Sequence, residues 1–167
     1  MYKIVNTNES QEKIRKSMVE ILGKTKLLSM ATVTSDNKPW INTVYFSFNE
    51  NLELYILTPP TSNHGQNLEK NKNVAVTVFE SNQNPGPGKQ GLQLFGTCER
   101  VGALELPKAL KSWWTRIIGK GVKEFVNEYM LGKVYTSRMY KITINHVKIF
   151  DEKMFGEETW VECEIER

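Results

Sequence analysis

Short runs of apolar and β-branched residues, separated by polar turns, recur along most of the chain. In the run 52–57, apolar side chains fall on every second position, as expected for a strand with one face in a core. The connections are brief and rich in Asn, Asp, Gly and Pro, which favours antiparallel pairing of successive strands. The pattern predicts strands at 26–34, 39–48, 52–57, 74–79, 91–101, 137–144, 147–150 and 159–165, the last of them at a sheet edge.

Four segments have the period of three to four residues that is typical of amphipathic helices. In the first, residues 9–22, an apolar stripe includes Ile14 and Met18, with Asn8 as the expected N-cap and Gly23 just after the expected end. The other helices are predicted at 66–71, 109–118 and 122–130.

The order of these elements predicts a mainly β protein of the α+β kind. One helix comes first, then five strands interrupted by a small helix, then two helices and two or three further strands. Short turns between strands indicate an antiparallel barrel, closed or half-closed, with helices at its ends, rather than a parallel α/β sheet. No internal repeat or linker divides the chain, so we expect a single domain over residues 1–167.

Composition narrows the classes of function. The net charge of +3 comes from Lys and Arg spread along the chain, so we expect no nucleic acid partner. No apolar run approaches the roughly 20 residues that a membrane span needs, and no signal sequence is recognisable, so we expect a cytoplasmic protein without a membrane partner. Cys98 and Cys163 are expected to be free thiols, and no Cys/His cluster indicates a metal.

The segment after the third strand carries the best candidate chemistry. It reads Thr58-Pro59-Pro60-Thr61-Ser62-Asn63-His64 and precedes the small helix at 66–71. The prolines fix the backbone, and hydroxyl, amide and imidazole groups follow at a helix N-terminus, where backbone N–H groups and the helix dipole favour an anion. Such a turn is suited to a phosphate. The alternative is a solvated loop in which His64 only helps to cap the helix.

Other candidate residues have structural interpretations. His146 is expected in a turn between two strands, and the Trp113-Trp114 pair is expected in the core or at a subunit contact. No nucleophile elbow, P-loop or dinucleotide-binding glycine motif is present in the sequence.

The order and spacing of several motifs resemble a known family. They are Pro39-Trp40 with Val44, then Leu54-Tyr55, then Thr58…Ser62-Asn63-His64 with Asn67-Leu68 and Asn71, then Gly91, Gln93, Gly96 and Cys98-Glu99. Together they resemble the FMN-binding split β-barrel proteins, and within them the pyridoxamine 5'-phosphate oxidase-like proteins of the general stress type.

This resemblance implies a six-stranded antiparallel split β-barrel with Greek-key character, flanked by about four helices. It also implies a homodimer that holds FMN at the subunit interface. Transferred position by position, the cofactor-binding residues would be Asn42, Thr43, Val44 and Tyr45 on one strand, Thr58 at the end of the next, Ser62, Asn63 and His64 on the phosphate turn with Asn67 beyond it, and Gln90 and Gly91 on a later strand.

Two departures from the family pattern affect the cofactor. The biosynthetic oxidase has Arg where Asn42 stands, and Arg-Lys where Asn63-His64 stand. Each lost charge-assisted hydrogen bond weakens phosphate binding by about 1.5–3 kcal/mol, so we expect weak FMN binding, with a deazaflavin or haem as alternatives. We find no set of residues for pyridoxal phosphate as substrate, and therefore do not expect pyridoxamine 5'-phosphate oxidase activity.

The function expected from the resemblance is that of an FMN-dependent oxidoreductase, moving hydride or electrons between a nicotinamide and an unidentified acceptor. The cofactor would supply the electron chemistry, so no catalytic side chain is predicted. The first alternative is a non-catalytic split barrel that binds or senses a flavin or haem. The second is an interaction module without a ligand, with exposed apolar residues serving a partner.

Overall fold

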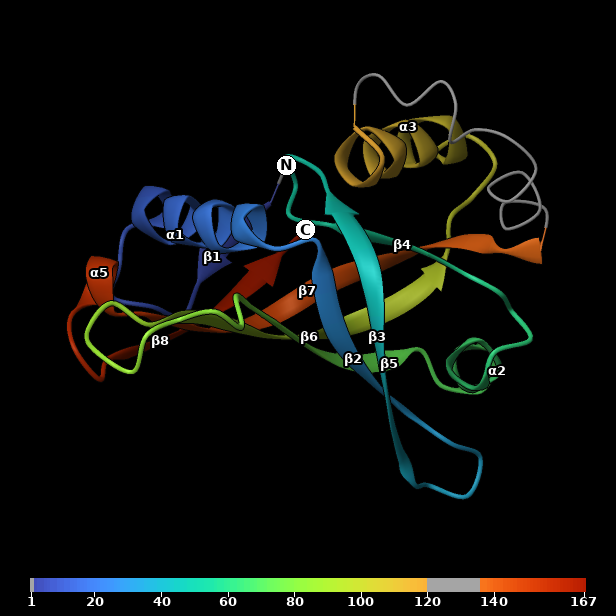
Figure 1. Ribbon diagram of the computed structural model, residues 1–167, viewed down its shortest axis with the longest axis horizontal. Coiled ribbons are helices and arrows are strands. Elements are labelled where there is room, and N and C mark those ends of the chain that lie inside the picture. The colour runs from blue at the N-terminus through green and yellow to red at the C-terminus, as the bar shows by residue number, and fades with distance from the viewer. Residues whose placement is uncertain (1, 120–135) are drawn as a thin grey trace.

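The computed structural model describes residues 2–119 and 136–167, and Figure 1 shows the arrangement of its elements. The helix predicted at 122–130 lies outside the described residues. The elements are β1 (Lys3–Val5), α1 (Gln11–Lys24), β2 (Leu27–Val33), β3 (Pro39–Phe48), β4 (Leu54–Thr58), α2 (Asn63–Lys70), β5 (Asn73–Phe79), β6 (Gln90–Arg100), α3 (Leu106–Ile117), β7 (Arg138–Asp151), α5 (Glu152–Phe155) and β8 (Trp160–Glu166).

Six of the strands close into an antiparallel barrel in the order β2–β3–β4–β7–β6–β5, with β5 pairing back to β2. The remaining strands extend it, because β8 pairs with β7 and β1 pairs with β8. The predicted fold class, a mainly β six-stranded split barrel flanked by helices, is therefore confirmed. No described helix is long and apolar enough to cross a membrane.

The prediction of two strands joined by a turn at Asn145–His146 is wrong, since Arg138–Asp151 is one continuous strand. The polar pair marks a bulge. Pairing with β6 passes from Phe95 opposite His146 to Gly96 opposite Ile144, which leaves Asn145 as the extra residue. A bulge bends a long strand and increases its twist. Strand β7 needs this bend because it pairs with three neighbours around the barrel, β4, β6 and β8.

Both ends of the chain also differ from the prediction. Residues Lys3–Val5 form a short strand, so β8 is not a sheet edge. Helix α1 begins two residues later than predicted, because Ser10 rather than Asn8 caps it by accepting a hydrogen bond from the Lys13 N–H at 3.3 Å. Ser, Asn and Asp are comparably good caps, so local sequence alone could not choose between them.

Helices close the barrel and cover one side of it (Figure 1). Inward side chains of the strands pack with Ile14, Met18, Ile21 and Leu22 of α1 in the main core. Helix α3 lies outside the barrel over β3 and β4, where Trp113 packs with Tyr55 and Met139 in a second cluster. The core interpretation of Trp113 is thereby confirmed.

The two cysteines are free, as expected, and both are buried in strands. Burial raises the pKa of the Cys98 thiol to about 12 and that of Cys163 to about 11. Both thiols are therefore protonated at neutral pH, and neither is a reactive nucleophile.

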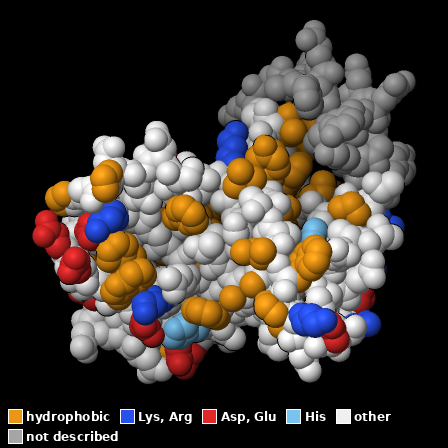
Figure 2. Space-filling model, turned by 60° about the horizontal axis from the view of Figure 1, so that its bottom comes forward, with side chains coloured by type: hydrophobic (Ala, Val, Ile, Leu, Met, Phe, Trp, Pro, Cys, Tyr) orange, Lys and Arg blue, Asp and Glu red, His pale blue; other side chains and the backbone are white. Residues whose placement is uncertain are grey.

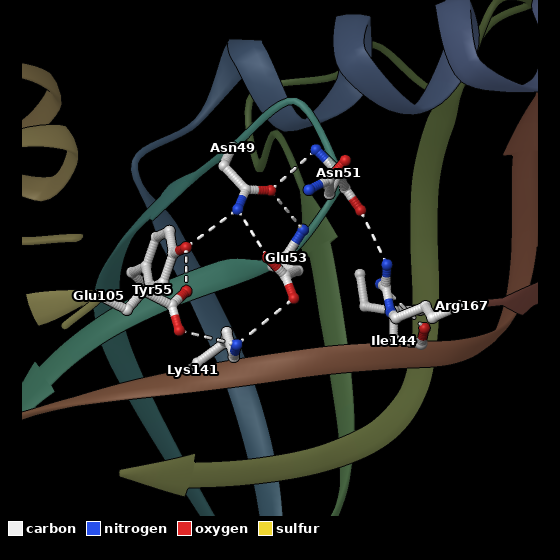
Figure 3. Close-up of polar contacts among 8 residues, drawn as sticks. All are labelled: Asn49, Asn51, Glu53, Tyr55, Glu105, Lys141, Ile144 and Arg167. Carbon is white, nitrogen blue, oxygen red and sulfur yellow. Dashed lines mark hydrogen bonds and ion pairs between the residues drawn. The ribbon is translucent and has the colours of Figure 1, made fainter. Parts of the chain in front are cut away.

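A polar network fixes α3 to the barrel (Figure 3). Tyr55 Oη donates to Glu105 Oε1 at 2.7 Å, directly before α3 begins, and accepts from Asn49 Nδ2 at 2.9 Å. Lys141 Nζ lies 2.9 Å from Glu105 Oε2 and 3.5 Å from Glu53 Oε1. Burial, followed by the hydrogen bond to Glu105, raises the pKa of Tyr55, so the phenol remains a donor at all physiological pH values. These contacts tie β4, β7 and α3 together.

Candidate functional site

The segment that leads from β4 into α2 is folded back on itself in a compact turn, residues 58–64, called here the α2 turn. Thr58 ends β4 with its side chain buried, and its Oγ1 lies 2.6 Å from Nε2 of His64. Pro59 and Pro60 cross directly over Gly65, where an added Cβ would lie 2.7 Å and 2.8 Å from their carbonyl oxygens. Only glycine fits at this position, so the prolines and Gly65 together set the path of the turn.

Ser62 is the N-cap of α2 rather than a free ligand group. Its Oγ accepts from the Gly65 N–H at 3.2 Å and donates to the Pro59 carbonyl at 2.7 Å. Because the hydroxyl hydrogen is already used within the turn, Ser62 shapes the turn more than it presents a donor to an anion.

Replacing Ser62 by Ala is therefore expected to lower the free energy of unfolding by about 1 kcal/mol, the usual effect of removing a helix N-cap. Ser62→Asp restores the acceptor and should recover most of that loss. Denaturant unfolding of both variants checks this. An unchanged midpoint for Ser62→Ala would show that the cap contributes nothing.

Asn63 and His64 start the helix and differ in how far they are engaged. The Asn63 side chain is exposed, and within the described part of the chain no hydrogen bond holds it. The His64 ring is half-buried, with Nε2 near the hydroxyls of both Thr58 and Ser62, at 2.6 Å and 3.1 Å. Burial lowers the pKa of His64, so the ring is neutral at pH 7. The turn thus offers an amide, an imidazole and backbone N–H groups, but no cation.

Since the pKa of His64 is lower in the folded than in the unfolded chain, the unfolded chain takes up the proton first as the pH falls. The stability that this residue contributes is present above its unfolded pKa of about 6.5 and is lost as the pH drops below it. Denaturant midpoints between pH 7.5 and pH 5.5 should fall more steeply for the wild type than for His64→Gln. Parallel pH profiles would contradict this assignment.

Asn42, Val44 and Asn67 lie on the inner side of the same barrel end. Asn67 Nδ2 donates to Thr32 Oγ1 at 3.0 Å, a buried bond that fixes α2 to β2. Val44 packs against the main core. Both polar atoms of the Asn42 amide are inaccessible and lack a hydrogen-bond partner within the described residues. A buried amide without hydrogen-bond partners lowers the stability of the fold, so we expect the Asn42 amide to have a partner.

Thr43 and Tyr45 point to the outer face of the barrel, because side chains alternate along β3. Thr43 Oγ1 lies 3.2 Å from Ser29 Oγ on the paired strand β2. Together with Thr77, these hydroxyls line a hollow of about 380 Å³. Sequence reasoning missed Ser29 and Thr77. Their positions opposite one another on β2 and β5 become apparent only from the strand register.

Gln90 and Gly91 are not brought to the α2 turn within one chain. Gly91 pairs with Phe79 and Thr97 with Asn73, so six residues, or about 20 Å of strand, separate Gly91 from the barrel end where α2 joins β5. The buried Gln90 side chain donates to Asp151 Oδ1 at 2.8 Å and accepts from Lys24 at the end of α1. The Gln90 side chain therefore has a structural role at the opposite end.

No group of three or more His, Cys, Asp or Glu residues that could hold a metal ion occurs in the described parts of the chain.

Comparison with known proteins identifies the family. A family model described as pyridoxamine 5'-phosphate oxidase matches residues 14–167. The chain belongs to the pyridoxamine 5'-phosphate oxidase family. The resemblance found in the sequence is thus confirmed. Among curated proteins, the chain is similar to UPF0306 protein PM1958 of Pasteurella multocida (strain Pm70), with 24% identity over 143 residues. The match covers 84% of this chain and 86% of the Pasteurella protein.

Solved structures show the same fold for this member of the pyridoxamine 5'-phosphate oxidase family. One is a Clostridium acetobutylicum protein related to general stress protein 26, with a TM-score of 0.66, 15% identity, and coverage of 93% of this chain and 96% of that one. Another is a heme binding protein from Mycobacterium smegmatis, with a TM-score of 0.68 and 14% identity. The latter match covers 94% of this chain but only 59% of the other protein. At such identities the likeness concerns the fold alone.

Proposed function

We propose that this protein binds FMN, with the phosphate at the α2 turn, and acts as a flavin-dependent oxidoreductase. The observation that carries the proposal is the start of α2, where Ser62 caps the Gly65 N–H and leaves the N–H groups of Asn63 and His64 without an acceptor among the described residues. The Asn63 amide is exposed and unengaged, and the N–H groups of the first turn lie at the positive end of the helix dipole. These donors fit a phosphate ester, although without charge assistance.

In this proposal the chain's own residues bind and orient. Asn63 and the backbone N–H groups at the start of α2 hold the phosphate, and His64, fixed by Thr58, contributes a neutral hydrogen bond. Thr43 and Tyr45 line the outer side of β3 for the ring system. A bound flavin supplies reversible hydride transfer with a nicotinamide nucleotide, which explains why the sequence needs no catalytic acid or base.

The deciding experiment is calorimetry with FMN, followed by steady-state oxidation of NADH or NADPH. Saturable binding with about one FMN per chain and cofactor-dependent turnover support the proposal. Binding without turnover with any acceptor would leave a flavin-binding or sensing protein. Absence of binding at saturating FMN would overturn the proposal.

Haem is the second candidate, and the half-exposed His146 is the ligand that would hold it. His146 lies on the outer face of β7 beside Phe95, with ring centroids 5.5 Å apart and Nε2 3.6 Å from Glu162. His64 Nε2 is already engaged in the α2 turn. Haem binding would therefore produce a Soret band that is lost in His146→Ala and kept in His64→Ala. The reverse result would exclude His146 as ligand.

The proposal includes a homodimer with the cofactor at its interface. The outer face of the β2–β3 hairpin exposes an apolar patch made up of Leu27, Ile41 and Tyr45. Of these, Ile41 is the most exposed, at 70%. Gly91 is remote from the α2 turn of its own chain, so it would contact the cofactor only across two copies, whereas the Gln90 side chain is buried in its own network and would not contact it. Ile41→Lys should shift sedimentation from dimer to monomer, and an unchanged dimer would rule out this patch as the subunit contact.

We also propose a cytoplasmic location, because a reducing compartment suits the two free cysteines.

A further inference from the structure

His64 is the one side chain of the α2 turn whose type changes charge between about pH 5 and pH 8. Its Nε2 lies 2.6 Å from Thr58 Oγ1 and 3.1 Å from Ser62 Oγ, so both neighbours are neutral hydroxyls. Figure 2 shows histidine atoms at two separate places on one face, one beside charged side chains and the other among hydrophobic and uncharged ones. The contact with a carboxylate, at 3.6 Å from Glu162, belongs to His146.

The elements around α2 bring no free carboxylate to this ring. Strands β2, β3 and β5 contain no charged residue, and the one titratable residue of β4, Tyr55, donates its hydroxyl to Glu105. Charged residues on the adjoining segments form ion pairs of their own, namely Asp36 with Lys38, Glu69 with Arg100, and Lys72 with Glu99. An anion from outside is therefore the partner that would change the charge of His64.

Two cations also belong to the segments that meet here. Arg138 of β7 pairs with Thr58 in the sheet and donates to the Ser137 carbonyl at 2.8 Å, and Lys70 lies in the last turn of α2. Arginine and lysine side chains stay charged over the range in which an imidazole titrates. Neither cation can therefore make ligand binding depend on pH between about pH 5 and pH 8.

In the free protein, the neutral form of His64 is favoured. Burial lowers the pKa of the ring, and the positive end of the α2 dipole also disfavours an imidazolium at this position. A bound anion acts in the opposite direction, because an opposite charge within about 4–6 Å shifts a pKa by about 1–3 units towards the charged form. An anion that accepts the backbone N–H of His64 is adjacent to the ring of the same residue.

The hydrogen bonds around His64 can accommodate the second proton. A hydroxyl both donates and accepts, so Thr58 Oγ1 and Ser62 Oγ can each accept from a protonated Nε2. The Ser62 hydrogen is already donated to the Pro59 carbonyl at 2.7 Å. Nδ1 has no hydrogen-bond partner within the described residues, which leaves its N–H available to a ligand.

We propose that His64 couples proton binding to phosphate-ester binding, so that the α2 turn holds its ligand more tightly as the pH falls. The inference rests on the proposed function, because it takes the phosphate to lie at this turn. His64 is neutral in the free protein and becomes an imidazolium beside the bound phosphate, where it supplies the cation that the turn otherwise lacks. The coupling is reciprocal: if the ligand raises the proton affinity of His64 tenfold, the protonated protein binds the ligand ten times more tightly than the neutral one.

The first measurement is an NMR titration of the histidine rings in the full-length protein, with and without saturating FMN. The chain contains only two histidines, so their signals can be followed separately. We expect FMN to raise the pKa of His64 by at least one unit. The titration of His146, on the outer face of β7, should not change and serves as the internal reference.

The second measurement is the affinity for FMN at pH 7.5 and pH 5.5, by flavin fluorescence, for the wild type and His64→Gln. A phosphate ester takes up a proton of its own near pH 6 (roughly), and the ratio of the two affinities cancels this effect. The ratio of wild-type to variant affinity should rise at least threefold from pH 7.5 to pH 5.5. Riboflavin, which lacks the phosphate, should show no such rise.

The outcomes separate this inference from the proposed function. FMN binding with a ratio that does not change with pH would overturn the coupling and leave the proposed function standing. A His64 pKa that FMN does not raise, or an equal rise of the ratio for riboflavin, would also overturn it. No FMN binding at either pH would overturn the proposed function and this inference together.

Discussion

Replacing Gly96 by Ala is expected to lower the free energy of unfolding by about 3 kcal/mol or more, enough to leave much of the chain unfolded or insoluble. Gly96 sits at the bulge where β6 pairs with β7, and its neighbour on the other side is Val74 of β5. An added Cβ would lie 2.0 Å from the Thr143 carbonyl oxygen and 2.9 Å from its carbon. These are backbone atoms, so the contact can be relieved only by opening the β6–β7 pairing that closes the barrel.

Gly91→Ala on the same strand is the matched control. Its Cβ would meet nothing closer than 3.5 Å, so we expect its stability to equal or slightly exceed that of the wild type. Denaturant unfolding of both variants gives the comparison. If Gly96→Ala and Gly91→Ala unfold at the same midpoint, the close approach at the bulge does not constrain the fold.

Asn63→Arg is expected to tighten FMN binding about tenfold or more. The α2 turn contains no cation, and Asn63 is exposed with no hydrogen bond to lose within the described residues. A guanidinium at the start of α2 would add a charge-assisted hydrogen bond to a phosphate, worth about 1.5–3 kcal/mol. Titrations by flavin fluorescence at low and at high salt would measure the gain, which screening should reduce.

Glu69→Gln is the control for net charge. It raises the charge of the same helix by one, but at an exposed position that pairs only loosely with Arg100 at 3.7 Å. Its FMN affinity should stay close to that of the wild type. If both variants bind FMN equally well, the gain reflects the overall field of the protein, and the phosphate does not sit at the α2 turn.

The site residues group differently in space than along the sequence. The sequence places Ser62, Asn63 and His64 together, and they do form one turn. The Ser62 hydroxyl, however, is already engaged as the N-cap of α2. Gln90 appears beside Gly91 as a possible ligand group, yet its side chain completes a buried network with Asp151. Whether a polar residue is free or already engaged depends on neighbours that are distant in the sequence, such as Asp151, and no local pattern reveals them.

Taken alone, the sequence was enough to determine the antiparallel barrel and the position of the α2 turn. Alternating apolar residues and short polar connections are local signals, and Thr58-Pro59-Pro60 followed by polar residues predicted a turn ahead of a short helix, although α2 begins at Asn63 rather than at residue 66. Tertiary structure decided the rest. The bulge at Asn145 and the pairing of β1 with β8 both depend on strand register, which barrel closure fixes and which local propensity cannot specify.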